Sequence, residues 1–189
     1  MRRATNLAVA TLFAFSLAST STALADSWPT SFGFFKGGVP IGGQTVNIYD
    51  GRSATPQEAS RIVNQALHDI GKKSTSLGNV WGIVQVVDSL AFNMRDQREA
   101  NKVYRKFEKG LRTLKVSEGT NAQLASAVHG IYKGLRLGAD PNRLWAGHNR
   151  RTLRNLQRAV RAPEIDLIVS ALRMDVAQSA GPAARGMFY

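Results

Sequence analysis

Apolar side chains recur every three or four positions along most of residues 55–178, which is the spacing of one face of an α-helix. The first helix is predicted to begin at TPQE, where Thr55 can cap it, Pro56 suits the first turn and Glu58 completes a capping box. Gly71 is expected to end this helix. These start and stop signals mark the beginning of a helical domain.

The segment LGNVWGIVQVVDSLAFNM, residues 77–94, is apolar on almost every side. Its β-branched stretch IVQVV would suit a buried strand. Its length, with DSLAF continuing the run, favours a helix instead. We therefore expect a buried helix at the centre of the domain.

The remaining helices are predicted from the same spacing and from the turn residues between them. They cover residues 95–114, 121–137, 141–162 and 163–178. Gly138 and Asp140-Pro141 mark one boundary, with Asp140 as the expected cap, and Pro163 opens the last helix. Six helical segments joined by short turns predict an all-α fold, a single-domain bundle of about five to six helices.

The first 25 residues have the layout of a secretory signal peptide. MRR is a positively charged start, Leu7–Thr20 is an apolar run, and Ala23–Ala25 places small side chains where a signal peptidase cuts. A retained membrane anchor is the alternative, because Leu7–Ala25 nearly reaches the roughly 20 residues that span a bilayer. The serines and threonines in the run and the Ala-x-Ala end favour cleavage. We therefore expect Sec-type export, to the periplasm or out of the cell.

Residues 26–54 are rich in glycine and aromatic residues and are expected to form an extended arm, with one short strand in TVNIYDG. Within the arm, GVPIGGQT at Gly38–Thr45 matches a phosphate-binding P-loop except that Gln44 replaces the lysine. We therefore expect flexible or closely packed backbone there rather than a nucleotide site. A flexible tail is expected at residues 179–189, which end in Met187, Phe188 and Tyr189.

Composition and charge add information about chemistry and partners. The chain has no cysteine, which excludes disulfides, thiolate nucleophiles and cysteine metal sites. Loss of Arg2 and Arg3 with the signal peptide lowers the formal net charge from +12 to +10 over the remaining 164 residues. The charge is concentrated, because residues 95–161 contain 16 Lys and Arg against five Asp and Glu. The electrostatic field of such concentrated positive charge affects which partners the protein attracts, and it says little about the fold.

Two basic stripes lie in this region, each spaced so that it falls on one face of a helix. The first basic stripe consists of Arg98, Lys102, Arg105, Lys109 and Arg112. The second basic stripe consists of Arg151, Arg154, Arg158 and Arg161. Leu153, Leu156 and Val160 occupy the opposite face of the second helix and are expected to face the core.

The ordinary explanation of a basic stripe is the solvated face of an amphipathic helix. Glu99 and Glu108 lie beside the first stripe and partly balance it. No acid lies between Pro141 and Pro163, and every basic residue after Lys133 is an arginine, whose planar guanidinium matches phosphate and carboxylate. The second stripe therefore favours contact with an anion.

Candidate catalytic residues are few. His148, at the edge of the second stripe, could act as a general acid or base with a neighbouring arginine. Glu118, in VSEGTN, could be the acid of a wall-cleaving enzyme. For both, a non-catalytic surface or loop residue is the stronger expectation. His68 and His129 complete no metal-binding spacing, and His129 is expected to be structural.

The leading hypothesis is an exported, non-enzymatic basic helical protein that binds an anionic envelope component or an acidic protein partner, within a surface or secretion assembly. Binding would use the second basic stripe, helped by the first. No cofactor and no metal are expected, and nucleic acid ranks below envelope partners because no nucleic-acid motif is present. The alternatives are a secreted hydrolase acting on peptidoglycan or nucleic acid, and a structural subunit of an envelope complex.

The signal peptide predicts the N-terminus of the exported protein. Cleavage after Ala25 should leave Asp26 as the first residue, because the small side chains of Ala23 and Ala25 fit the peptidase. Mass spectrometry of the protein recovered outside the cytoplasm measures this directly. An intact Met1 in that material would contradict cleavage.

Overall fold

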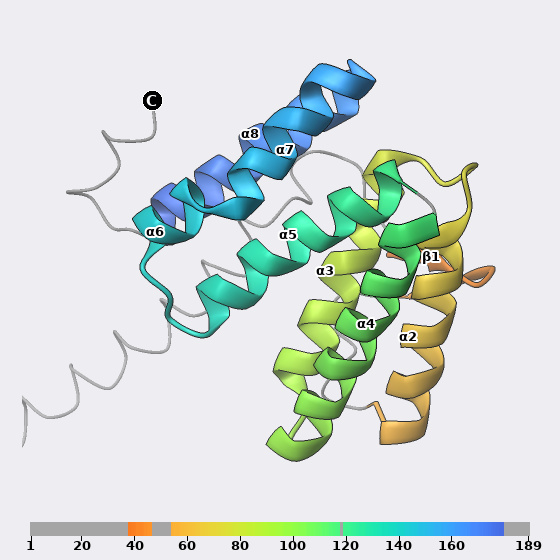
Figure 1. Cartoon of the computed structure of the whole chain (residues 1–189). Helices are drawn as coiled ribbons and strands as arrows, with labels where there is room; N and C mark the ends of the chain where they lie inside the picture. Colours follow the sequence, from red (N-terminus) through yellow and green to blue (C-terminus); the bar gives the residue numbers. More distant parts are fainter. Residues whose placement is uncertain (1–37, 47–53, 118, 180–189) are drawn as a thin grey trace, which may run out of the picture. The chain divides into compact units, whose positions relative to one another are not determined.

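The computed structural model describes residues 38–46, 54–117 and 119–179, which belong to one compact unit of the chain (Figure 1). They form a two-stranded hairpin followed by helices, so the predicted all-α class is confirmed. The strands are β1 (Val39–Ile41) and β2 (Gln44–Val46). The helices are α2 (Pro56–Gly71), α3 (Leu77–Asn93), α4 (Gln97–Ser117), α5 (Thr120–Arg136), α6 (Pro141–Ala146), α7 (His148–Val160) and α8 (Pro163–Ser179).

Some of the sequence predictions fall outside the described residues. They concern the signal peptide at residues 1–25, the arm apart from residues 38–46 and 54, Glu118, and the tail from residue 180 onward. These remain predictions.

Helix α3 is the centre of the bundle. Of its 17 residues, 14 are buried, and it packs against α2, α4, α5, α8 and β1 (Figure 1). A helix that is apolar on all sides needs neighbours on all sides, whereas an amphipathic helix needs them on one. The expectation of a buried central helix over residues 77–94 is therefore confirmed, and the strand alternative is excluded.

The capping box predicted at the start of α2 is present. Thr55 Oγ1 accepts a hydrogen bond from the Glu58 backbone N–H at 3.2 Å, and the Glu58 carboxylate accepts from the Thr55 N–H at 2.8 Å. The helix ends at Gly71, as predicted. Local sequence thus determines both ends of this helix.

The helix predicted over residues 141–162 is two helices, α6 and α7, with Gly147 between them. Glycine is a poor helix former, so a break costs least there. The break gives the two short helices separate axes. Trp145 of α6 is buried with the Arg173 guanidinium of α8 lying 5.9 Å from its ring centre, while α7 buries Leu153.

Helix α7 ends at Val160, slightly before the predicted end near Ala162. The cause is local, because Arg161 has a left-handed backbone with φ of 47°. Few non-glycine residues adopt this conformation, and it cannot continue a helix. Arg161 therefore belongs to the turn before α8 and does not continue the helical face of the other arginines.

Two glycines allow α6 and α7 to pack closely against α5. A Cβ atom at Gly130 would lie 2.8 Å from the Asn149 side chain of α7, and one at Gly134 would lie 2.6 Å from the Leu144 side chain of α6. Both distances are shorter than side chains tolerate. The two glycines, one helical turn apart, therefore set how closely α6 and α7 approach α5.

The segment that resembles a P-loop is a β-hairpin. Val39 pairs with Val46 and Ile41 with Gln44, and the turn between the strands is made by Gly42 and Gly43, with φ of 59° and 78°. Two consecutive positive φ values are typical of the tight turns that join hairpin strands. Strand β2 includes Thr45 and Val46 of the strand predicted in TVNIYDG, and residues 47–51 of that prediction lie outside the described residues. Its partner strand, Val39–Ile41, was not predicted.

The hairpin packs against the helices and is hydrogen-bonded to α2. Val39 and Ile41 are buried, and β1 packs against α2 and α3. The Gly42 N–H donates a hydrogen bond to Asp69 Oδ2 of α2 at 2.6 Å. Burial opposes ionisation of Asp69, but the Gly42 N–H and Lys72 outweigh it and lower the pKa of this carboxyl. The backbone amide of the glycine turn is thus used within the protein.

No helix in the described part of the chain is both long enough and apolar enough to cross a membrane.

The close contact of α5 with α6 predicts the effect of a larger side chain at Gly134. Gly134→Val should destabilise the fold by about 1–3 kcal/mol, because the new methyl groups would overlap the Leu144 side chain. Urea denaturation measures the change. In a Leu144→Ala background the same substitution should cost much less, and an equal cost in both backgrounds would contradict the contact.

Candidate functional site

Helix α7 exposes its arginines and buries its leucines. Leu153 and Leu156 are 1% and 3% exposed, on a helix that packs against α5, α6 and α8. The exposed cations of this segment are Arg150, Arg151, Arg154 and Arg158 on the helix and Arg161 in the turn that follows it, and we call these five residues together the α7 arginine face. The sequence assignment of Leu153 and Leu156 to the core and of the second stripe to solvent is therefore confirmed. Val160 is only half-buried.

The α7 arginine face has no acidic partner among the described residues. None of the ion pairs there includes one of its arginines. Asp166, near the start of α8, instead accepts a hydrogen bond from Gln157 at 3.0 Å. Five guanidinium groups therefore lie on one short segment, and no carboxylate of the described residues forms an ion pair with them.

The first basic stripe lies on the exposed side of α4. Lys102 pairs with Glu99, with 2.6 Å between Nζ and Oε1. Glu108 instead hydrogen-bonds Lys133 on α5, and its Oε1 lies 3.4 Å from His129 Nε2. Glu108 therefore neutralises a cation of α5, so the stripe is less balanced than the sequence suggests.

The two stripes occupy different parts of the bundle. Helices α4 and α7 both pack against α5, which lies between them (Figure 1). Helix α4 also packs against α2 and α3, whereas α7 packs against α6 and α8. The stripes therefore form two separate basic surfaces. In the described part of the chain the α7 arginines form no ion pair, whereas Lys102 of the first stripe pairs with Glu99.

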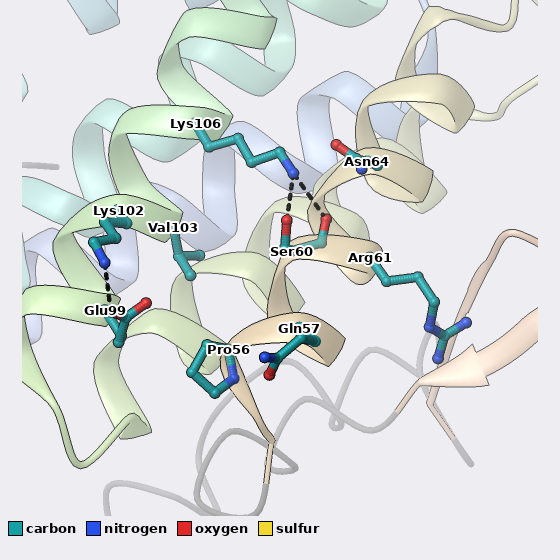
Figure 2. Close-up of a pocket in the computed structure, with 9 residues that line it drawn as sticks. All are labelled: Pro56, Gln57, Ser60, Arg61, Asn64, Glu99, Lys102, Val103 and Lys106. Carbon is teal, nitrogen blue, oxygen red and sulfur yellow. Dashed lines mark hydrogen bonds and ion pairs between the residues drawn. The ribbon is translucent and has the colours of Figure 1, made fainter.

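A pocket of about 520 Å³ opens between α2 and α4 (Figure 2). Helix α2 supplies Pro56, Gln57, Ser60, Arg61 and Asn64, and helix α4 supplies Glu99, Lys102, Val103 and Lys106. Of the first basic stripe, only Lys102 lines the pocket. Arg61 and Lys106 belong to neither stripe, so the sequence pattern did not group them with Lys102.

The buried histidine, His129, belongs to a chain of ionisable groups that links α3, α5 and α4. His129 Nδ1 lies 2.7 Å from Asp88 Oδ1, and its Nε2 faces Glu108, which also binds Lys133. Burial opposes protonation of His129, but its hydrogen bonds with Asp88 and Glu108 outweigh burial and raise the pKa of the imidazole. The Phe107 ring meets the imidazole edge-on, with 5.3 Å between ring centres.

This environment makes His129 a structural residue. It is 4% exposed, and both of its ring nitrogens face carboxylates. A general acid or base must reach a substrate proton, directly or through one water. His129 joins three helices instead, which agrees with the role expected from its sequence.

A second buried cluster joins α3, α5 and α8. The Tyr132 hydroxyl accepts hydrogen bonds from Trp81 Nε1 at 3.1 Å and Gln85 Nε2 at 3.0 Å, and donates to Asp175 Oδ2 at 3.1 Å. Burial raises the pKa of Asp175 to about 6, although the Tyr132 hydroxyl partly opposes this shift. Burial also raises the pKa of Tyr132, so its phenol keeps the proton that it donates.

The two candidate catalytic residues gain no support. Glu118 and the His148 side chain lie outside the described part of the structure, and the backbone of His148 begins α7. Within the described residues, no group of three or more His, Asp and Glu side chains is arranged to hold a metal ion.

Comparison of the chain with protein-family models, with curated proteins and with solved structures found no match. The site is therefore interpreted from its own geometry.

The raised pKa values of the buried groups predict that stability falls as the pH rises toward neutrality. The folded-state pKa of Asp175 is about 6 against an ordinary 3.8, so its stabilising contribution is complete below pH 3.8 and is lost by about pH 6. The contribution of His129 is complete below its ordinary value of 6.5 and is lost as the pH passes its higher folded value. The lowered pKa of Glu108 has the opposite effect and costs stability only as the pH falls below 4.5.

Asp175→Asn tests the first of these contributions. An asparagine can accept the Tyr132 hydrogen bond without carrying a buried charge, so at neutral pH the variant should be more stable by as much as about 3 kcal/mol. Urea denaturation of both proteins, at mildly acidic and at neutral pH, measures this. An equal loss of stability with pH in both proteins would show that Asp175 is not the titrating group.

Proposed function

We propose that this protein is an exported, non-enzymatic binding protein that contacts an anionic envelope component or an acidic protein partner through the α7 arginine face. One observation carries the proposal. Five exposed arginines lie on one short segment with no acidic partner in the described part of the chain. An ordinary solvated surface mixes positive and negative charges.

The chemistry of arginine supports an anion as the ligand. A guanidinium is planar and always charged, and its fork of N–H donors fits the oxygens of phosphate and carboxylate. Leu153 and Leu156 anchor α7 in the bundle, so the cations are presented from a packed helix rather than from a loop. Less side-chain and backbone freedom is then lost when the face binds.

The location of the proposed partner follows from the predicted export. Outside the cytoplasm, anions that present many phosphates or carboxylates to a surface include lipid headgroups, wall polymers and acidic proteins. Nucleic acid ranks below these because no nucleic-acid motif is present and residues 148–161, which carry the face, contain no Phe, Tyr or Trp side chain on which an unpaired base could stack.

A secreted hydrolase acting on peptidoglycan or nucleic acid is the second candidate. It would need a cleft containing Glu118, or His148 with a second titratable group. Neither side chain is among those described, and the described histidine with the most polar contacts, His129, is enclosed in the core. The α7 arginine face supports the binding protein instead, including its variant as a subunit of an envelope complex.

Removing three charges from the α7 arginine face should weaken retention on an anionic matrix while leaving the fold intact. The test variant carries Arg151→Gln, Arg154→Gln and Arg158→Gln. The matched control removes three exposed cations elsewhere, as Lys73→Gln, Arg95→Gln and Arg143→Gln. On phosphocellulose the test variant should elute at clearly lower salt than the wild-type protein, and the control should elute close to the wild type. Circular dichroism checks that both variants fold.

Equal losses in the two variants would show that net charge, and not this face, causes retention. Unchanged retention of the test variant would contradict the proposal outright. A pull-down from the cell envelope over a salt series, with wild type and test variant in parallel, then identifies the partner. Contacts to phosphate weaken steeply with salt, so a specific partner should be released progressively as the salt is raised.

A further inference from the structure

The pocket between α2 and α4 combines charge with neutral hydrogen-bonding groups. Three of its residues are cations, Arg61, Lys102 and Lys106, and one is an acid, Glu99. Its volume of about 520 Å³ lies within the roughly 300–1,000 Å³ of small-molecule sites. Figure 2 shows Lys106 of α4 directed at Ser60 of α2, whereas Arg61 of α2 extends toward the β-hairpin, away from the two lysines.

The cations are unequally neutralised within the protein. Lys102 is paired with Glu99, which raises the pKa of the lysine. Among the described residues, Lys106 bonds only the neutral groups of Ser60, its carbonyl and its hydroxyl. Arg61 donates to the Gln44 side chain of β2 at 3.1 Å, on the side of the hairpin. The pocket therefore carries a net positive charge that is centred on Lys106.

The position of Lys106 makes it the best placed of these groups to bind a ligand. Its side chain is half-buried, and Ser60 holds the ammonium group between the two helices (Figure 2). An ammonium group has three N–H donors, and Ser60 takes two of them. A positioned, partly desolvated cation binds an anion more strongly than a mobile surface lysine does.

The neutral residues of the pocket indicate what accompanies the anionic group. Gln57, Ser60 and Asn64 lie on one face of α2, and their amides and hydroxyl can each donate and accept hydrogen bonds. Such groups match the hydroxyls of a sugar, which also donate and accept. Pro56 and Val103 add an apolar surface suited to the C–H face of a sugar ring.

We propose that the pocket between α2 and α4 binds an anionic saccharide, a sugar that bears a phosphate or a carboxylate group. Lys106 contacts the anionic group, and Gln57 and Asn64 contact the sugar hydroxyls. This site is separate from the α7 arginine face, on helices that do not include α7, so neither proposal depends on the other.

Titration of the ¹⁵N-labelled full mature chain, followed by NMR, tests the site. The probes are glucose 1-phosphate, glucuronate, inorganic phosphate and glucose. Both anionic sugars should shift amide signals of α2 and α4 and should bind at least ten-fold more tightly than inorganic phosphate or glucose. The stronger of the two anionic sugars identifies the charged group. The proposal would be overturned if neither anionic sugar shifted amide signals of α2 and α4. It would also be overturned if inorganic phosphate bound as tightly as the anionic sugars.

Matched variants assign the site to the pocket. Lys106→Met should weaken binding of the anionic sugars at least ten-fold, whereas Lys109→Met, which removes an exposed charge of the same helix outside the pocket, should have little effect. Gln57→Ala should reduce the preference for glucose 1-phosphate over inorganic phosphate and leave phosphate binding unchanged. Equal weakening by the two lysine variants would contradict the proposal. Thermal unfolding checks that Lys106→Met folds, and Gln57→Ala provides a second variant on the opposite wall.

The α7 test variant separates this proposal from the proposed function. It should bind glucose 1-phosphate as the wild-type protein does, because its substitutions lie outside α2 and α4. Loss of sugar binding in that variant would contradict the assignment to the pocket. Loss of matrix retention with intact sugar binding would support both sites.

Discussion

The contact between α3 and α5 is the interaction on which the rest of the bundle depends. Helix α3 is buried on nearly all sides, so its polar residues Gln85 and Asp88 lie in the core. Buried polar groups are costly unless they have hydrogen-bond partners, and α5 supplies these partners as His129 and Tyr132. A shift of α5 along α3 by one turn would separate both pairs at once. The polar contacts therefore define a register that apolar packing alone would leave less specific.

The same contacts determine which charges reach the surface. The Glu108 carboxylate of α4 contacts His129 and accepts a hydrogen bond from Lys133, both on α5. It therefore does not neutralise the cations of the first basic stripe. On its other side α5 carries Gly130 and Gly134, where α7 and α6 pack closely. That packing buries the leucines of α7 and leaves its arginines exposed. The α7 arginine face thus results from the position of α5 as much as from the spacing of the arginines.

The pocket between α2 and α4 has a related origin. The first basic stripe lies on the exposed side of α4. Lys106 lies outside this stripe, on the side of α4 that packs toward α2, where Ser60 accepts its hydrogen bonds. A cation held between two helices differs from one on an open surface, because it is partly desolvated and its orientation is defined. The protein therefore has two kinds of basic site. One is an open arginine face suited to an extended anion, and the other is a pocket suited to a small one.

The sequence by itself determined the elements and their faces, because those depend on residues close together in the chain. The capping box at Thr55, the all-round apolar run of α3, and the opposite faces of Leu153 and Arg154 all follow from local spacing. Only the tertiary structure decided which distant side chains meet. Lys106 could not be joined to Ser60, nor His129 to Asp88 and Glu108, since their spacings of 46, 41 and 21 residues carry no periodic signal. Gly147 was a local signal for the break in the helix predicted over residues 141–162, but a single glycine is tolerated inside many helices, so the sequence alone did not require a break there.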